Sequence, residues 1–469
     1  MPVTVEKEMK QRALEKLSNA FMLFAVGIFI LSPFLQLVLR FIDQDNPNWR
    51  DPESPLLLNH DYARAVYQEM MKAVNIAACF AAQFFYVCLV MRFLQRRKEL
   101  GDVFKARWKR FIPVMLMLLF AAAILAVTLI RGATVYDLEG HPYMNESIYS
   151  YILYVICYFF CGVMIWNNKF KRVLLYILVL TSVPVNAVAH IQEWMGGVSF
   201  VSGERIDGIF HNSNHYAYYL ALVTIASLLL FVYEEKFLLK FLNAVCAFFA
   251  ITILIPNDTF GAFLAVLFVL IAFTVYCIIR DRKHLVGALV ALGIFLGCTA
   301  LMSIWYNTVI SSFFQLTRDV QSIAANPSEA GNAGTTRWRL WTGTVEHMKE
   351  SPWLGFGVEG LLTKYDIGTP HNELLQYAEA FGIPTTLLYF ASVVSIFVII
   401  LRHNRKFSKE TLICFCMAVC YFVSSMVGVA IYYTTPFFYI LLGMTYAEYL
   451  HGVPAPHEKS AENTASDKK

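Results

Sequence analysis

Charged residues are scarce in this chain of 469 residues. Asp, Glu, Lys and Arg together make up 15% of the sequence, whereas hydrophobic residues make up 58%. A soluble domain carries about a quarter of charged residues. This composition leaves too little polar surface to cover a globule of this size in water. It excludes an ordinary soluble protein and predicts that lipid is the solvent for much of the chain.

The features of several other protein classes are missing as well. All ten cysteines fall inside predicted membrane spans, and none lies in a long loop where exported proteins place disulfides. Cys157/Cys161 and Cys416/Cys420 have helical spacing, but no His or carboxylate accompanies them, so close packing is favoured over a metal site. The sequence also shows no P-loop, no dinucleotide-binding fingerprint and no second soluble domain.

Long apolar runs, in contrast, are abundant. A helix needs about 20 residues to cross a bilayer, and these runs are too long and too rich in Leu, Phe and Ala for barrel strands. We therefore expect an all-α, polytopic membrane protein with about twelve transmembrane helices. The expected spans are 20–41, 73–94, 111–130, 148–166, 173–191, 215–233, 237–255, 260–279, 285–305, 382–401, 411–430 and 432–450, and the last two are open to a different division.

Clusters of Lys and Arg predict the orientation, because such residues mark cytoplasmic loops. They fall on every second loop of the twelve-span arrangement, which places both termini inside. We expect spans one to nine within 1–305 with an outer-face motif at 203–217, an extracytoplasmic loop at 306–381, spans ten to twelve within 382–452, and a disordered cytoplasmic tail at 453–469. Within the long loop, helices are expected near 308–325 and 336–350.

Residues suited to phosphate and proton chemistry gather in two outer segments. Arginine holds phosphate through a planar, permanently charged fork, and histidine can move protons near neutral pH. The alternative for each arginine is a snorkelling surface residue, and for each histidine an interfacial or capping residue. The candidates are Arg205, His211, Asn212, Asn214 and His215 in the first segment, and Arg337, Arg339, Trp341, His371 and Asn372 in the second.

Two asparagines in these segments have the pattern of helix N-caps. Asn214 precedes the sixth span, and Asn372 precedes an apolar stripe at 374, 378 and 381. A cap at Asn372 places His371 just ahead of a helix N-terminus, which is a favourable place for an anion.

The order and spacing of these residues resemble a known family. The pattern Arg205-x-x-Gly208-x-Phe210-x-Asn212-x-Asn214, with Ala217 following, is similar to the first signature of the O-antigen ligase and polymerase superfamily. The second signature is matched by Arg337-x-x-x-Trp341, Pro352-x-x-Gly355-x-Gly357, His371-Asn372 and Gly382-Ile383. The resemblance covers roughly residues 170–430.

This resemblance implies glycosyl transfer from an undecaprenyl-diphosphate-linked glycan on the outer face of the bacterial cytoplasmic (inner) membrane. It implies that Arg205 and Arg337 bind the diphosphate and that His371 is the catalytic histidine. Further substrate-binding candidates are Arg339, Asn212, Asn214, His215, Trp341 and Asn372. The expected partners are the lipid-linked donor, a glycan or lipid acceptor, and membrane lipids, but no nucleic acid. By the same resemblance, no cofactor and no metal are expected.

One element departs from the family, and the exact activity stays open. Asn257-Asp-Thr-Phe-Gly261 stands where many relatives carry a Ser-Arg-Gly-like element, with Phe260 at the position of the arginine. Arg339 or Arg131 is a candidate to replace it.

A ligase, which passes the glycan to lipid A core, is slightly favoured over an O-antigen or capsular polysaccharide polymerase. A lipid-linked oligosaccharide flippase or secondary transporter, and a structural scaffold, are alternatives of other classes.

Overall fold

The structure is a computed structural model, and it describes most of the chain. The described residues are 3–43, 45–49, 108–140, 146–164, 168–194, 206–210, 212–328, 330–358, 360–403 and 407–451, with single residues between 59 and 91. Every regular element in these ranges is a helix, and none is a strand. Most of the predicted second span and the tail at 453–469 lie outside the described residues.

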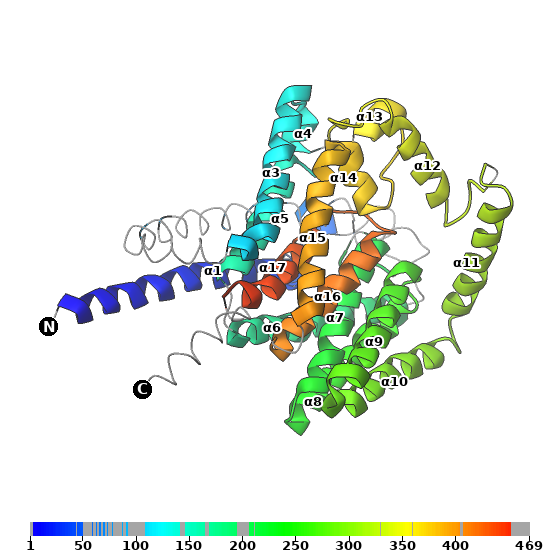
Figure 1. Cartoon of the computed structure of the whole chain (residues 1–469). Coiled ribbons are helices and arrows are strands. Elements are labelled where there is room, and N and C mark those ends of the chain that lie inside the picture. The colour runs from blue at the N-terminus through cyan, green and yellow to red at the C-terminus, as the bar shows by residue number, and fades with distance from the viewer. Residues whose placement is uncertain are drawn as a thin grey trace.

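Most of the α-helices in the described chain are long, and four of them have only 5 to 12 residues (Figure 1). The α-helices are α1 (Val3–Ile42), α3 (Ile112–Arg131), α4 (Val135–Glu139), α5 (Ile148–Met164), α6 (Asn168–Trp194), α7 (Ser213–Tyr233), α8 (Phe237–Leu254), α9 (Phe260–Arg280), α10 (Leu285–Met302), α11 (Thr308–Ala325), α12 (Arg337–Met348), α13 (Gly360–Tyr365), α14 (Glu373–Phe381), α15 (Ile383–His403), α16 (Lys409–Ser425) and α17 (Thr435–His451). Three 3-10 turns lie at Pro47–Trp49, Trp108–Phe111 and Arg282–His284. The helices predicted near 308–325 and 336–350 are confirmed as α11 and α12.

Helix α7 is the axis of the bundle. Nearly all of its residues are buried, as expected for a helix that is apolar on all sides and surrounded by other helices. It packs against α8, α9, α10 and α16. A second group, in which α5 packs on α17 and α3 on α15, completes the bundle. Figure 1 shows both groups meeting around α16 and α17.

Seven helical segments are long and apolar enough to cross a membrane. They are Trp108–Arg131, Asn168–Trp194, Ser213–Tyr233, Phe237–Leu254, Phe260–Arg280, Arg282–Met302 and Ile383–His403. The apolar parts of α1 and α5 are shorter, and α16 and α17 have 17 residues each. The expectation of an all-helical, multi-pass membrane protein is confirmed, and the count of about twelve spans stays a prediction.

The two ends of the bundle differ in chemistry. At one end, the ammonium group of Lys171 donates to Thr411 Oγ1 at 2.6 Å and lies 3.9 Å from a Glu448 carboxylate oxygen. Arg172 pairs with Glu234 at the same end. The other end, here called the site end, holds the first residues of α7, α9 and α17 and the last residues of α8, α10 and α16.

The connection between α16 and α17, residues 426–434, lies at the centre of the site end and is here called the link. The Tyr218 hydroxyl donates to Ser424 O at 3.1 Å just before it. A Cβ atom on Gly428 would lie 1.2 Å from the Tyr218 hydroxyl oxygen, and one on Gly261 would lie 2.4 Å from the Val427 side chain. The expected span 411–430 therefore ends early, at Ser425, because the chain leaves the helix to pack closely against α7 and α9.

The close packing at Gly428 predicts a strong effect of one methyl group. Gly428→Ala should destabilise the folded protein by about 1–3 kcal/mol, the usual cost of overpacking. The matched control is Gly297→Ala in α10, where an added Cβ meets no atom within 4 Å. Thermal unfolding of the purified proteins in detergent measures both. An unchanged unfolding midpoint for Gly428→Ala would contradict the described packing of the link.

Candidate functional site

Arg337 begins α12 and directs its guanidinium group at the link. Its Nε donates to Val427 O at 3.2 Å, and its Nη1 donates to Gly334 O at 3.2 Å and to Thr335 Oγ1 at 2.6 Å. The two preceding residues, Thr335 and Thr336, have φ values of 54° and 70°, which non-glycine residues rarely adopt. Such strain gathers at functional sites. The turn thus fixes the arginine against the link.

Helix α14 is attached to the same link. The side-chain oxygen of Asn372 accepts from Leu375 N at 3.0 Å, so the predicted N-cap is confirmed, and its Nδ2 donates to Met426 O at 2.9 Å. One turn later, Gln376 exchanges two hydrogen bonds with the backbone of Ala430, at 3.1 and 2.9 Å. Two points therefore fix the first turn of α14. Gln376 received no role in the sequence analysis.

His371 stands directly before this cap with a left-handed backbone, φ 52°. Its Nδ1 atom is buried and has no hydrogen-bond partner within the described ranges. Burial, and then the positive charge of Arg337, lower the pKa of His371 to about 4. The expectation of a pKa near neutrality is therefore wrong for the free protein, because the site is drier and more positive than an open loop. The imidazole is neutral at pH 7 and lies within the electrostatic reach of Arg337.

The described part of the first signature meets the link from another side. The ring of His215 stacks on Tyr433, with centroids 5.6 Å apart, and Phe210 lies 6.4 Å from the same tyrosine. His215 is buried. Arg205 and His211 lie outside the described residues, so their positions relative to Arg337 and His371 are not part of this geometry.

The N-cap of α7 is Asn212 and not Asn214. Asn212 has an extended backbone, and its side chain accepts from Asn214 N at 2.8 Å. Ser213 and Asn214 are already helical, so the prediction was two residues too late. The apolar run that marked the sixth span begins only after the polar first turn, which is why the sequence pattern shifted the start.

Asn257 anchors the first signature, and the sequence reading missed this role. It is fully buried and donates to Ile206 O at 2.5 Å and to Ser213 O at 3.1 Å. Phe260, at the position of the family's arginine, packs edge-on against Phe313 with centroids 4.9 Å apart. This turn therefore supports the site through packing and backbone contacts instead of supplying a cation.

Asp207 is a second group that the sequence reading left without a role. It is 1% exposed, and neither carboxylate oxygen has a hydrogen-bond partner in the part of the chain that the structure describes. Burial raises the pKa of Asp207 to about 8. The side chain is therefore mostly protonated at pH 7 and does not add a full negative charge to the first signature.

Arg131, one candidate for a replacement phosphate ligand, is engaged elsewhere. Its Nη2 donates to both carboxylate oxygens of Asp137, at 2.8 and 2.9 Å. Its Nη1 donates to Leu354 O at 3.3 Å and to Ala380 O at 3.2 Å, and Val358 N donates to Asp137 at 3.0 Å. The pair joins the end of α3 to the glycine-containing loop before α13 and to the last turn of α14.

This ion pair also explains two glycines of the second signature. Gly355 and Gly357 have φ values of 66° and 95°, and a Cβ on Gly355 would lie 2.5 Å from Ala380 O. A Cβ on Gly357 would lie 2.7 Å from Arg131 Nη2. The glycines let the loop lie directly on the ion pair and on α14, so they position the helix that follows His371.

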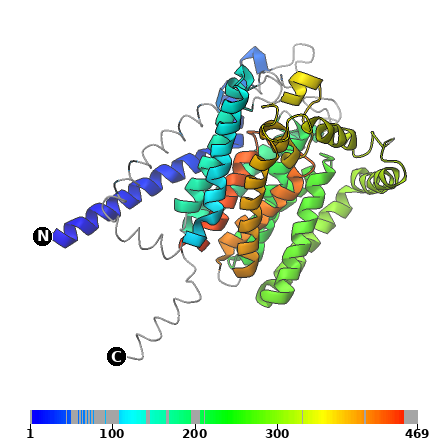
Figure 2. The same cartoon turned by 45° about the horizontal axis from the view of Figure 1, so that its top comes forward.

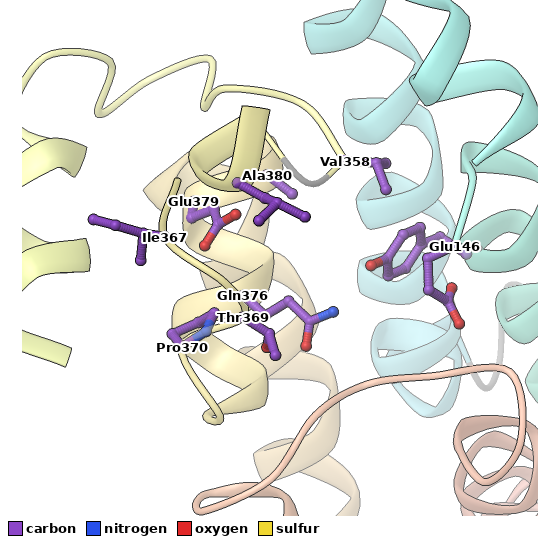
Figure 3. Close-up of a pocket in the computed structure, with 10 residues that line it drawn as sticks. Glu146, Val358, Ile367, Thr369, Pro370, Gln376, Glu379 and Ala380 are labelled. Carbon is purple, nitrogen blue, oxygen red and sulfur yellow. The ribbon is translucent and has the colours of Figure 1, made fainter. Parts of the chain in front are cut away.

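A small acidic pocket lies beside α14 (Figure 3). Thr369, Gln376 and Glu379 line it together with Glu146 from the segment before α5. Its volume is about 20 Å³, enough for about one water molecule and too little for a sugar ring. Two carboxylates disfavour a phosphate in this pocket, whereas the Arg337 side of His371 is positive.

Another cavity in the described part of the chain is apolar and distant from these groups. It holds about 100 Å³ between α9, α15 and α16, lined by residues such as Phe273, Ile400 and Phe415. Its lining comes from the last half of α9 and the first half of α16. It therefore lies away from the link, in the other half of the bundle.

Comparison with known proteins gives one family match, which covers part of the chain. Residues 244–390 match a family model described as O-antigen ligase. This match supports membership of the O-antigen ligase superfamily. The matched region runs from α8 to the first turns of α15 and contains Arg337, His371 and the loop glycines Gly355 and Gly357. No curated protein matches the chain.

The ion pair of Arg131 and Asp137 predicts a large stability effect far from the link. Asp137→Ala leaves a mostly buried guanidinium group without its counter-charge, so it should cost roughly 3–5 kcal/mol. The control is Glu346→Ala, which breaks the exposed pair with Lys349 and should leave stability unchanged. Unfolding midpoints in detergent compare the two variants. Equal midpoints would show that the pair does not hold the loop in place.

The lowered pKa of His371 predicts a direction of pH dependence. Because the folded pKa of about 4 lies below the ordinary histidine pKa of 6.5, the unfolded chain binds a proton in this window and the folded protein does not. This contribution to stability is fully present above pH 6.5 and is lost as the pH falls toward 4. His371→Gln should therefore lose less stability than the unmodified protein between pH 7 and pH 5. Identical losses would mean that His371 titrates normally.

Proposed function

We propose that this protein transfers a glycan from an undecaprenyl-diphosphate donor to an acceptor hydroxyl on the outer face of the bacterial cytoplasmic membrane, as an O-antigen ligase does. One observation carries the proposal: Arg337 and His371 lie together against the link, within the region that matches the family model. The proposed site needs no cofactor and no metal ion.

The distribution of basic residues supports the outward orientation. Lys171, Arg172 and Arg280 lie at the end of the bundle opposite the link. Because Lys and Arg favour the cytoplasmic side, the site end is assigned to the outer side. A lipid-linked donor brought to the outer leaflet then presents its diphosphate at the level of Arg337.

The proposed role of Arg337 is to stabilise the leaving group. Breaking the bond between sugar and phosphate builds negative charge on the diphosphate, and fixed cations in a partly dry site stabilise that charge best. Arg337 is fixed before any donor arrives, because Val427 O and the strained turn at Thr335 hold it. Arg205, by resemblance, supplies the second cation. The N-terminal end of α14 adds a favourable dipole for an anion.

The proposed role of His371 is to accept the proton of the acceptor hydroxyl. The hydroxyl oxygen attacks the anomeric carbon, the bond from that carbon to the phosphate oxygen breaks, and the electron pair stays on the diphosphate. The proton passes to the neutral imidazole. A bound diphosphate places negative charge beside His371 and offsets Arg337, which raises the pKa of the imidazole. Donor binding therefore strengthens the base at the moment it is needed.

The position of each remaining candidate residue suggests its role. Asn212 and Asn372 cap helices, so we propose that they position the site. His215 and Trp341 are candidates for contacts with the sugar or the diphosphate, and so is Asn214, which precedes His215 in the first turn of α7. Arg339 is exposed, so it is the neighbouring cation with which Arg337 is compared. Ligase and polymerase chemistry share this donor site and differ in the acceptor.

Glycan transfer by purified variants tests the assignment. Arg337→Ala should reduce the rate of transfer by about 100- to 1000-fold, the usual cost of removing a group that stabilises transition-state charge. Arg337→Lys should recover only part of it, because lysine keeps the charge and loses the fork. His371→Ala should lower turnover while leaving donor affinity largely unchanged. The assay uses excess chelator and two acceptors, lipid A core and a second lipid-linked repeat unit.

The matched control is Arg339→Ala, which removes an arginine two residues away and should transfer at nearly the normal rate. Near-normal transfer by Arg337→Ala would refute the assignment of Arg337 to the donor site. An inactive Arg339→Ala with an active Arg337→Ala would move the phosphate contact by two residues. Activity that depends on added magnesium would overturn the metal-free mechanism.

A further inference from the structure

Helix α11 has an apolar face that the other described elements leave largely exposed. The exposed fractions of its large apolar side chains are 42–63%, at Ile310, Phe313, Phe314, Leu316 and Val320. The helix has no buried residue. Its other side carries Ser311, Gln315, Arg318 and Ser322, at the spacing of a polar helix face. An apolar helix face of this size needs a partner other than water.

The position of α11 is fixed by its first turns. Thr308 Oγ1 donates to Ile255 O at 3.1 Å, and Phe313 packs on Phe260. The membrane-spanning helix α10 ends at Met302, so only residues 303–307 separate it from α11. In Figure 2, α11 is seen nearly end-on beside the ends of the green helices α9 and α10, whose lengths are in view. The helix therefore runs across the direction of the spans at the level where α10 ends.

The apolar surface of α11 continues that of α10. Leu301, Ile304 and Trp305 are 42%, 74% and 67% exposed and connect the two helices. Tryptophan is enriched at membrane–water boundaries. Helix α11 carries one arginine and one aspartate, Arg318 and Asp319, so charge does not select a partner and apolar contact must do so. These features are those of a helix that lies in the plane of a lipid–water interface.

We propose that α11 is an interfacial membrane helix whose apolar face enters the boundary between lipid headgroups and acyl chains. The partner is the lipid surface itself, at the same leaflet in which α10 ends. A second copy of the chain, or another protein, is the competing occupant of this face.

The helix is also joined to the arginine of the site. Asp319 Oδ2 accepts from Gly334 N at 2.9 Å, and Gly334 O accepts from Arg337 Nη1 at 3.2 Å. Trp338 Nε1 donates to Pro327 O, in the turn after α11, at 2.9 Å. The depth of α11 in the interface therefore sets the depth of Arg337. This second step rests on the proposed function, in which Arg337 must meet a diphosphate at headgroup level.

Spin labels on the two faces test the membrane contact without any assay of activity. Phe314→Cys and Val320→Cys place labels on the apolar face, and Gln315→Cys and Ser322→Cys place matched labels on the polar face. The full-length protein is labelled in lipid nanodiscs, and the unsubstituted protein reports background from native cysteines. Apolar-face labels should be accessible to oxygen and shielded from a water-soluble nickel chelate, with the reverse for polar-face labels.

Two outcomes would overturn the proposal. Equal access of the nickel chelate to all four labels would place α11 in water. Immobile apolar-face labels that neither reagent reaches would assign the face to a protein partner or a second copy.

A kinetic comparison tests the connection to Arg337. Val320→Glu should raise the KM for the lipid-linked donor by on the order of tenfold, because a charge on the apolar face lifts the helix out of the lipid. Ser322→Glu, on the polar face, should leave the KM unchanged. If the spin labels show the expected accessibility but the KM of Val320→Glu is unchanged, α11 is a membrane helix that is not coupled to Arg337. If the protein transfers no glycan at all, the proposed function fails while the labelling result stands.

Discussion

Backbone carbonyl groups in the link between α16 and α17 hold the site together. The carbonyl oxygens of Met426, Val427 and Ala430 accept from Asn372, Arg337 and Gln376. Buried non-helical backbone needs such partners, because an unpaired buried carbonyl group costs free energy. The link therefore binds side chains from the first turns of α12 and α14. These contacts bring Arg337 close to His371, which directly precedes the cap of α14.

The cost of this arrangement is visible in the surrounding backbone. Thr335, Thr336 and His371 adopt left-handed conformations, and Gly428 leaves no space for a side chain beside Tyr218. Strain of this kind persists only where the surroundings over-determine it. The ion pair of Arg131 and Asp137 is one such constraint, because it fixes the far end of α14 while the link fixes its first turn. A rigid, partly dry site also accounts for the low pKa of His371.

The sequence predicted the local features of this molecule better than its long-range contacts. Apolar runs and basic clusters were sufficient for the all-helical, multi-pass class, and the polar residue before an apolar stripe was sufficient for the cap at Asn372. Hydropathy could not show that the chain leaves the helix at Ser425, because the residues of the link are nearly as apolar as a span. The contacts of Arg131 with Leu354 and Ala380, and those of Asn257 with Ile206 and Ser213, join segments that only the folded chain brings together. The lowered pKa of His371 likewise follows from burial beside Arg337, which no spacing reveals.

The most direct test of the proposed donor site is a cryo-EM map of the protein in lipid nanodiscs with undecaprenyl diphosphate bound. The account predicts phosphate density in contact with the Arg337 guanidinium group and beside His371, next to the link. Phosphate density in the acidic pocket near Glu146 and Glu379, or at the apolar cavity between α9 and α16, would contradict it.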